Sequence, residues 1–345
     1  MLTVTRTALS MSPESRHGTT RKAKSTRTRR HTSLLEKDRI FLVCSAQLDG
    51  YHACRPVKDP TLTPAIDGHQ HFWDPARVPL PWLGPEHAAI TRAFDPEELE
   101  PQLIASDIVA TILVQAACSN EDTDFMLEHA RRYDWIAAVV AWLPLEDPDL
   151  TATRLEELHA EPKLRGIRHL IHDEADPHWI LQSAVLESLA LVESAGLVLE
   201  LPAVFPRHLV DVPELARRFP ALTIVIDHLG KPPLGRPDVL RDWTTQLKEA
   251  ATYPNVAAKI SGLNTTLDRP DWSASDLIPA INTALEAFGP NRLFCGSDWP
   301  VSLLNNGDYR HIWAETRSAV EQVAPEHFET LLSTNAQSLY DHGAN

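Results

Sequence analysis

Cysteine is scarce in this 345-residue sequence, and long apolar runs are missing from it. The four cysteines, Cys44, Cys54, Cys118 and Cys295, form no Cys-x-x-Cys pair and no dense framework, which is typical of a reducing compartment. The best apolar candidate, at 40–48, has about half of the roughly 18 residues that a membrane helix needs. We therefore expect a cytoplasmic protein without a membrane span.

Positive charge is scarce as well, since 32 Lys and Arg stand against 47 Asp and Glu, a formal net charge of −15. The imbalance is uneven: residues 1–60 hold 12 basic and 5 acidic side chains, whereas residues 61–345 hold 20 and 42. An acidic main portion argues against a general nucleic-acid binder, because phosphate contacts require clustered basic groups. The composition leaves the oligomeric state open.

The first part of the chain differs from the rest. Residues 16–33 are basic, rich in Ser and Thr and free of acidic residues, with too few apolar side chains to repay the cost of ordering. We expect residues 1–62 to be a disordered basic extension and residues 63–345 to be the working domain. The extension could be a targeting peptide, a tail that touches anionic surfaces, or the product of an upstream start codon with the working protein beginning near Thr63.

From residue 64 onward, short β-branched apolar runs alternate with longer segments of helical period. The runs predict strands at 65–69, 108–115, 136–143, 164–170, 196–202, 222–228, 255–262 and 291–298. Amphipathic segments between them predict helices, for example at 95–106, 181–196 and 208–219. Apolar strands that alternate with helices indicate a parallel sheet covered on its outer side.

Eight such units over about 280 residues predict an α/β fold, the (β/α)8 TIM barrel. The alternative is an open doubly wound sheet. No GxGxxG or P-loop motif follows any of the predicted strands, which removes the usual nucleotide signatures of that alternative.

Ionisable side chains gather where the predicted strands end, which is where a barrel of this type has its active site. His69 ends the first run and His71 follows it, Asp227 and His228 end the sixth, and Asp298 ends the eighth. Core packing gives no reason for this pattern, because unpaired polar groups inside a barrel are costly. We therefore expect His69, His71, His228 and Asp298 to be the catalytic residues.

Two kinds of chemistry suit these four residues. Three imidazoles and a carboxylate can bind one zinc-like divalent ion and leave room for water. Alternatively, His69, His71 and His228 polarise a substrate carbonyl directly, without a metal, while Asp298 takes a proton from the attacking water. Either arrangement hydrolyses a carbonyl compound, so the expected partner is a small-molecule substrate.

Other polar and aromatic residues at the strand ends are candidates for substrate binding. Arg168 can anchor a carboxylate with its planar guanidinium, or can form a buried ion pair, for which Glu200 is the candidate partner. The remaining candidates are His169, Trp73, Gln115 and Lys231, with weaker candidates at His172, Asn264, Trp82 and Trp299. Packing of the aromatic residues and solvation of the lysine are the competing interpretations.

Four motifs in barrel order resemble the amidohydrolase superfamily, and most closely its sugar-lactonase branch. They read HQHFWDP at 69–75, GIRH at 166–169, DHLGKP at 227–232 and GSDWPV at 296–301, and the resemblance runs from about Ile66 to Tyr340. It implies a lactonase that opens a small cyclic ester, such as a fuconolactone, rhamnonolactone or pyrone-dicarboxylate lactone. The alternatives are a metal-dependent non-oxidative decarboxylase on the same barrel and an inactive binding protein.

The sequence departs from many superfamily members in one respect. Those members hold two metal ions through a carboxylated lysine and histidines from two adjacent strands. Here the fourth strand ends in IRHL without a lysine, and the fifth ends in Glu200. We therefore expect one divalent ion or none.

Overall fold

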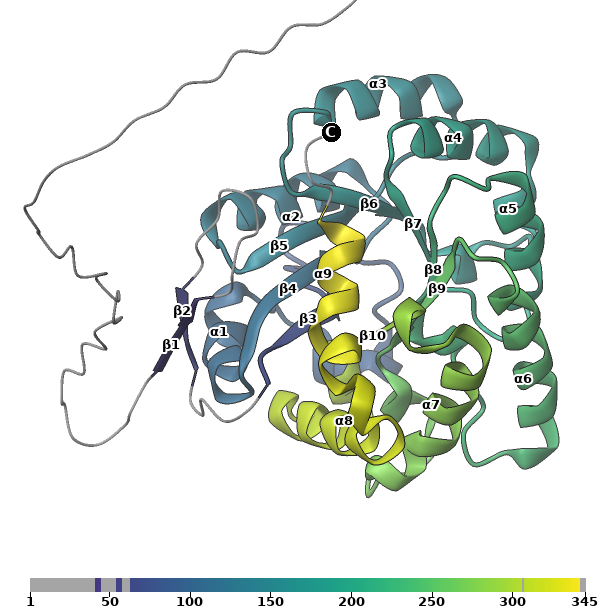
Figure 1. The fold of residues 1–345 in the computed structure, drawn as a ribbon. Helices are drawn as coiled ribbons and strands as arrows, with labels where there is room; N and C mark the ends of the chain where they lie inside the picture. The colour runs from purple at the N-terminus through teal and green to yellow at the C-terminus, as the bar shows by residue number, and fades with distance from the viewer. Residues whose placement is uncertain (1–40, 45–53, 58–62, 306, 342–345) are drawn as a thin grey trace, which may run out of the picture. The chain divides into compact units, whose positions relative to one another are not determined.

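The computed structural model describes residues 41–44, 54–57, 63–305 and 307–341 (Figure 1). Eight parallel strands form one sheet, and each strand lies beside its neighbour in the sequence. These strands are β3 (Ala65–Gln70), β4 (Ile108–Val114), β5 (Ile136–Ala141), β6 (Leu164–Arg168), β7 (Val198–Leu201), β8 (Ile224–Ile226), β9 (Val256–Ile260) and β10 (Leu293–Cys295). All eight predicted strands are confirmed.

Backbone hydrogen bonds between the end of the first strand, β3, and the residues that follow the last strand, β10, close the barrel. The backbone N–H of Asp298 donates to the carbonyl of His69, and the N–H of His71 donates to the carbonyl of Trp299, both at 2.8 Å. Gly296 permits this approach, because a Cβ at that position would lie 2.7 Å from the backbone nitrogen of His69. The predicted (β/α)8 barrel is thus confirmed.

The side chain of Asp67 also joins β3 to the end of the barrel. Its carboxylate accepts the backbone N–H of Ser297 at 2.8 Å and the hydroxyls of Ser297 and Tyr309 at 2.6 and 2.8 Å. Burial raises the pKa of Asp67 to about 6, although these hydrogen bonds act in the opposite direction.

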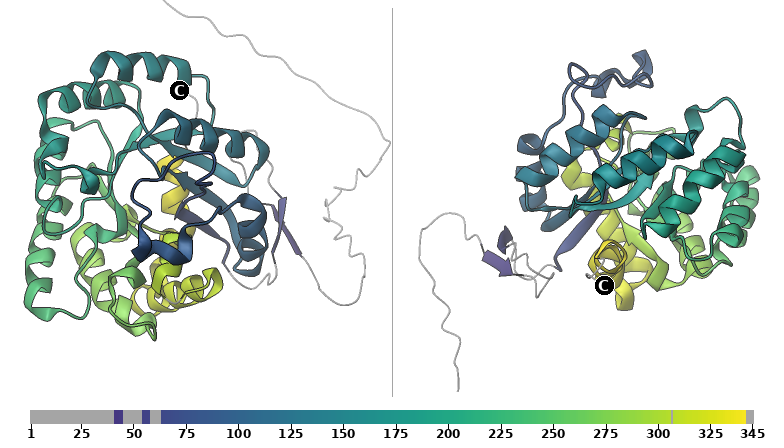
Figure 2. Two further views of the ribbon diagram at one scale, coloured as in Figure 1. Left: turned by 180° about the vertical axis from the view of Figure 1, so that it is seen from behind. Right: turned by 90° about the horizontal axis from the view of Figure 1, so that it is seen from above.

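Helices surround the strands on their outer side (Figures 1 and 2). They are α1 (Pro96–Ala105), α2 (Asn120–Arg132), α3 (Pro148–Leu158), α4 (Ser183–Ser194), α5 (Val212–Arg218), α6 (Pro237–Ala251), α7 (Ala274–Phe288) and α8 (Tyr309–Val323). The helices predicted at 95–106 and 181–196 correspond to α1 and α4. The segment 208–219 divides into a 3₁₀ turn, Leu209–Asp211, and α5.

Local sequence signals start several of these helices. The side chains of Asp95, Ser119, Asp147 and Asp308 each accept the N–H of the residue three positions later, which satisfies one of the unpaired donors of a first helical turn. Proline follows at the first helical position of α1 and α3, where its missing N–H costs nothing.

The barrel interior is apolar at one end and polar at the other. Inward-facing residues such as Ile112, Val140, Val225 and Phe294 form a buried cluster that also includes Tyr340. Tyr340 belongs to the last helix, α9 (Asn335–Tyr340), which lies across one end of the barrel (Figure 1). Because inward positions alternate along a strand, the polar residues of the site continue the same faces toward the opposite end.

Most of the predicted basic extension, residues 1–62, lies outside the described residues. Within it, β1 (Phe41–Cys44) and β2 (Cys54–Val57) pair antiparallel, and neither strand was predicted. In the part of the chain that the structure describes, no helix combines the length and the apolar character needed to cross a membrane.

Candidate active site

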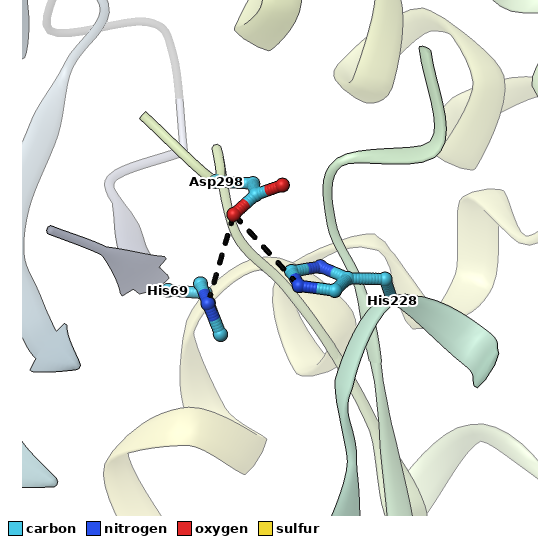
Figure 3. Close-up of side chains that lie close together, drawn as sticks. All are labelled: His69, His228 and Asp298. Atoms are coloured by element: carbon cyan, nitrogen blue, oxygen red, sulfur yellow. Dashed lines mark ion pairs between the residues drawn. The ribbon is translucent and has the colours of Figure 1, made fainter. Parts of the chain in front are cut away.

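Three histidines and one aspartate converge at the C-terminal ends of the barrel strands. His69 and His71 come from the end of β3, His228 follows β8, and Asp298 lies three residues beyond β10. Oδ1 of Asp298 lies 3.7 Å from Nε2 of His69, 3.4 Å from Nε2 of His71 and 3.8 Å from Nε2 of His228. Figure 3 shows His69 and His228 directed at the same carboxylate oxygen. The four residues predicted to be catalytic therefore lie together, and all are buried.

The backbone that presents His228 and Asp298 is not a strand, which corrects the predicted strand ends. β8 ends at Ile226, and Asp227–Gly230 form a 3₁₀ turn in which His228 and Leu229 have φ values of 54° and 52°. Asp298 has a φ of 58°, beyond the end of β10 at Cys295. Left-handed backbone at non-glycine residues is uncommon and concentrates at functional sites.

Hydrogen bonds fix how two of the imidazoles are presented. Nδ1 of His71 donates to the carbonyl of Val114 at 2.8 Å, which directs its Nε2 toward the site. Nδ1 of His228 forms a hydrogen bond of 2.9 Å with Oγ of Ser261, which directs its Nε2 toward Asp298. Burial lowers the pKa of His228 to about 4, so this ring is neutral at physiological pH.

Asp298 is ionised in this setting. Burial alone raises the pKa of Asp298, but its interactions with the imidazoles of His228, His71 and His69 together bring it below the ordinary aspartate value. Oδ2 of Asp298 is buried and accepts no hydrogen bond from the described residues. The site thus holds a carboxylate oxygen with free lone pairs beside three imidazoles.

Beneath these residues lies a buried charged layer that the sequence analysis missed. Lys259, at an inward position of β9, is fully buried, and its Nζ lies 2.5 Å from Oε2 of Glu200, 3.6 Å from Oδ1 of Asp227 and 3.0 Å from Nδ1 of His69. The hydroxyl of Tyr340 donates to the other oxygen of Glu200. A lysine inside a fully buried apolar strand was the available signal, because such a lysine requires paired partners.

Arg168 forms an ion pair, but not with the partner that the sequence suggested. Its Nε lies 3.1 Å from Oδ2 of Asp227, and one terminal nitrogen donates to the carbonyl of Gln115 at 3.1 Å. Glu200, the expected partner, is paired with Lys259 instead. Glu200 lies opposite Arg168 in the register of β6 and β7, but its two carboxylate oxygens accept hydrogen bonds from Lys259 and Tyr340.

The other residues predicted to bind substrate are held in different ways. His169 stacks on Trp179 and hydrogen-bonds with Glu174 at 2.8 Å, and it accepts the indole N–H of Trp142. Trp73 is buried, and its N–H donates to the carbonyls of Ile90 and Arg92. Substrate binding by these two residues stays a prediction.

Gln115 and Lys231 have fewer partners. The Nε2 of Gln115 lies 3.5 Å from the sulfur of Cys118, and its buried Oε1 accepts no hydrogen bond from the described residues. Lys231 is partly buried, has a φ of 54°, and lies 3.4 Å from the hydroxyl of Thr265. Both residues are available to contact a substrate, which also stays a prediction.

The donor set of the cluster fits a divalent metal ion. Ligand atoms of His69, His228 and Asp298 lie within 4.8 Å of one another, and Nε2 of His71 adjoins them at 3.1 Å from Nε2 of His69. Imidazole nitrogens with a carboxylate oxygen are the ligands of catalytic zinc sites, and the unpaired Oδ2 of Asp298 adds a further donor. A second group of potential ligands consists of His69, Glu200 and Asp227. The ammonium of Lys259 contacts His69 and Glu200 of this group.

An ionised carboxylate among three imidazoles at the C-terminal mouth of a parallel barrel defines a barrel hydrolase. The amidohydrolase family profile matches residues 66–342 of this chain. A protein named L-fucono-1,5-lactonase from Burkholderia multivorans is 40% identical over 275 residues, which cover 75% of this chain and 92% of the relative. The chain belongs to the amidohydrolase family.

Two further comparisons agree with this membership. A protein named L-fucono-1,5-lactonase from Burkholderia ambifaria is 39% identical over 253 residues, 72% of this chain and 85% of the relative. The crystal structure of an amidohydrolase from Burkholderia multivorans with bound zinc aligns with a TM-score of 0.74 and 36% identity, over 80% of this chain and 99% of that one.

Proposed function

We propose that this protein is a lactonase that opens a small cyclic ester, with the 1,5-lactones of sugar acids as the first substrates to test. The observation that carries the proposal is the convergence of three imidazoles on the buried carboxylate of Asp298. The two Burkholderia relatives, whose names specify L-fucono-1,5-lactone hydrolysis, support the choice of substrate class.

The proposed reaction begins with the lactone carbonyl oxygen against the imidazoles of His69, His71 and His228. A divalent ion such as zinc, held by these residues and Asp298, would polarise the carbonyl and lower the pKa of a bound water. Asp298 takes a proton from the water that attacks the carbonyl carbon. The imidazoles stabilise the tetrahedral oxyanion, and Asp298 returns the proton to the ring oxygen as its bond to the carbonyl carbon breaks. Lactone and water thus give one hydroxy acid.

The proposal includes three further points. Arg168, His169, Trp73, Gln115 and Lys231 line the substrate position. Residues 63–345 form the catalytic domain, and residues 1–62 form a basic extension that takes no part in the chemistry. The protein works in the cytoplasm, which its scattered cysteines favour.

The experiment that tests the function is lactone hydrolysis by the full chain, followed with a pH indicator because each turnover releases acid. The panel contains L-fucono-1,5-lactone, other aldono-1,5- and 1,4-lactones and one linear ester, each corrected for spontaneous hydrolysis. We expect turnover of at least one aldonolactone and none of the linear ester. Absence of turnover across the panel would refute the lactonase, and release of CO₂ from hydroxybenzoates would then test the decarboxylase alternative.

Chelation separates the two forms of the mechanism. Turnover that survives treatment with a chelator shows that the imidazoles polarise the carbonyl themselves. Turnover that is lost on chelation and restored by zinc shows that His69, His71, His228 and Asp298 work through a metal ion.

A further inference from the structure

The junction between β3 and β10, the first and last strands of the sheet, lacks the ladder of backbone hydrogen bonds that joins every other pair of neighbouring strands. Here the described residues form only an isolated bridge, between Gln70 and Trp299. We call this junction the seam and define it as residues 67–71 and 296–299. The seam carries His69 on one side and Asp298 on the other.

Glycine lets the two backbones of the seam approach closely. A Cβ on Gly68 would lie 2.7 Å from the carbonyl oxygen of Cys295, and a Cβ on Gly296 would lie 2.8 Å from the Cβ of His69. Neither position therefore has room for a side chain. The relative position of the two backbones is then set by the hydrogen bonds that cross the seam.

One buried carboxylate, that of Asp67, holds both sides of the seam. Its Oδ1 accepts the backbone N–H of His69 at 3.1 Å and that of Ser297 at 2.8 Å. Its Oδ2 accepts the hydroxyls of Ser297 at 2.6 Å and Tyr309 at 2.8 Å. Oγ of Ser297 in turn accepts the N–H of Trp299 at 3.0 Å. Asp67 is fully buried, so water does not compete for these bonds.

The register of β3 explains why the N–H of His69 is bonded by a side chain. The pairing of β3 with β4 is interrupted between Asp67 and Gln70, and such an irregularity takes a residue out of the ladder. A buried N–H without a partner is costly, so an acceptor on a side chain stabilises the irregular backbone. The carboxylate of Asp67 supplies that acceptor for His69, and it supplies the same acceptor for Ser297, which directly precedes Asp298.

We propose that Asp67 is a positioning residue that fixes the seam and thereby the placement of His69 opposite Asp298. Nε2 of His69 lies 3.7 Å from Oδ1 of Asp298 (Figure 3). Asp67 also bonds Tyr309 at the start of α8, on the outer side of the strand, and so does not reach the substrate. This role depends on backbone geometry and holds with or without a metal ion. The inference rests on the proposed function for the reaction and deepens it.

The first test is hydrogen–deuterium exchange of the full chain, followed by mass spectrometry of peptides from the seam. The amides of His71 and Asp298 donate across the seam, so their exchange reports its opening. We expect Asp67→Leu to raise their exchange rate by at least about tenfold, because the variant leaves two buried N–H groups without an acceptor. Unchanged exchange at the seam would overturn the proposal.

Asn255→Ala is the matched control for this test. The side-chain amide of Asn255 lies just before β9, at the end of the barrel opposite the site, and donates to the carbonyls of Ala216, Phe219 and Leu222. Its loss should destabilise the fold and leave exchange at the seam unchanged. Equal acceleration of the seam amides in Asn255→Ala and Asp67→Leu would mean that Asp67 supplies general stability only, and the proposal would be wrong.

The second test is turnover of an aldonolactone, with kcat and KM measured separately. We expect Asp67→Leu to lower kcat by at least about tenfold and to leave KM within about twofold, because a displaced base affects the reaction more than substrate binding. Asp67→Asn keeps an oxygen for the two N–H donors and should recover most of the lost turnover. An unchanged kcat per folded molecule in Asp67→Leu would contradict the proposal.

Ser297→Ala replaces Asp67→Leu if the latter does not fold. It removes the hydroxyl that joins Oδ2 of Asp67 to the N–H of Trp299 and keeps both N–H bonds to Oδ1. It should raise exchange at the seam and lower kcat, and no change in either quantity would overturn the proposal. The exchange measurement uses no lactone. Seam amides that do not respond would therefore refute this inference alone, and a wild type that turns over no lactone would refute the lactonase alone.

Discussion

Gly262 and Asp298 approach so closely that a methyl group on Gly262 would overlap Oδ2 of Asp298. Gly262 follows β9 and also has a φ of 57°, which favours glycine. Gly262→Ala should therefore displace the carboxylate of Asp298, the proposed general base. We expect kcat to fall by roughly 100-fold, because small displacements of reacting groups are costly, and the free energy of unfolding to fall by about 1–2 kcal/mol.

Gly196→Ala is the matched control for that variant. Gly196 has a φ of 67°, and a Cβ there would meet nothing within 4 Å. Both variants should lose similar stability in urea unfolding, and only Gly262→Ala should lose turnover. Equal activity in the two variants would show that the volume beside Asp298 is not needed.

Asp298→Asn tests the proposed general base. Asparagine keeps the shape and cannot take a proton, so we expect kcat for the lactone to fall by about 10³-fold or more while the far-UV circular dichroism is retained. Asp308→Asn is the control, because Asp308 caps α8 and asparagine is an equally good cap. Substantial turnover in Asp298→Asn would remove Asp298 from its proposed role.

Ser261→Ala tests the orientation of His228. The hydroxyl of Ser261 is the hydrogen-bonding partner of Nδ1, and loss of such a partner commonly costs 10–100-fold in activity. We expect a loss of kcat in this range. Ser188→Ala removes a buried hydroxyl that has no hydrogen-bond partner among the described residues, so steady-state kinetics should match the wild type.

Asp122 should make stability depend on pH. It is fully buried, its Oδ2 accepts the N–H of Ala116, and burial raises its pKa from 3.8 to about 7. The folded state then binds more protons than the unfolded state between these values, so this group stabilises the fold at low pH and the contribution is lost as the pH rises through about 7.

Asp122→Asn should remove the contribution of Asp122 to the pH dependence of stability. The free energy of unfolding of the variant minus that of the wild type should rise from pH 4 to pH 8, by on the order of 4 kcal/mol at most. Urea unfolding of both proteins at these two pH values is the measurement. A difference that stays constant with pH would contradict the raised pKa.

The sequence predicted the barrel well because its signal repeats along the chain. Each strand is a short apolar run, and several helices carry their own start signal, such as Asp95 before Pro96. The strand ends were predicted too long. His228 and Asp298 continue apolar runs in the sequence, but both adopt left-handed backbone, which residue type does not reveal outside glycine.

The convergence of His69, His71, His228 and Asp298 was predictable for the same reason, since these residues stand at or just beyond strand ends. The buried charged layer below these residues was not predictable from the sequence. Lys259 and Glu200 lie 59 positions apart, and their pairing depends on the register of β7, β8 and β9. Arg168 was given the wrong acidic partner because the sequence does not show that Lys259, which is remote along the chain, binds Glu200.

The contact between the first and last strands has a consequence for biosynthesis. His69 is translated early, near the start of the barrel, and Asp298 is translated 229 residues later. The two residues come together only when hydrogen bonds close the barrel. No intermediate on the ribosome can hold a complete site before the eighth strand emerges. A chain that lacks the eighth strand therefore cannot hold the complete site.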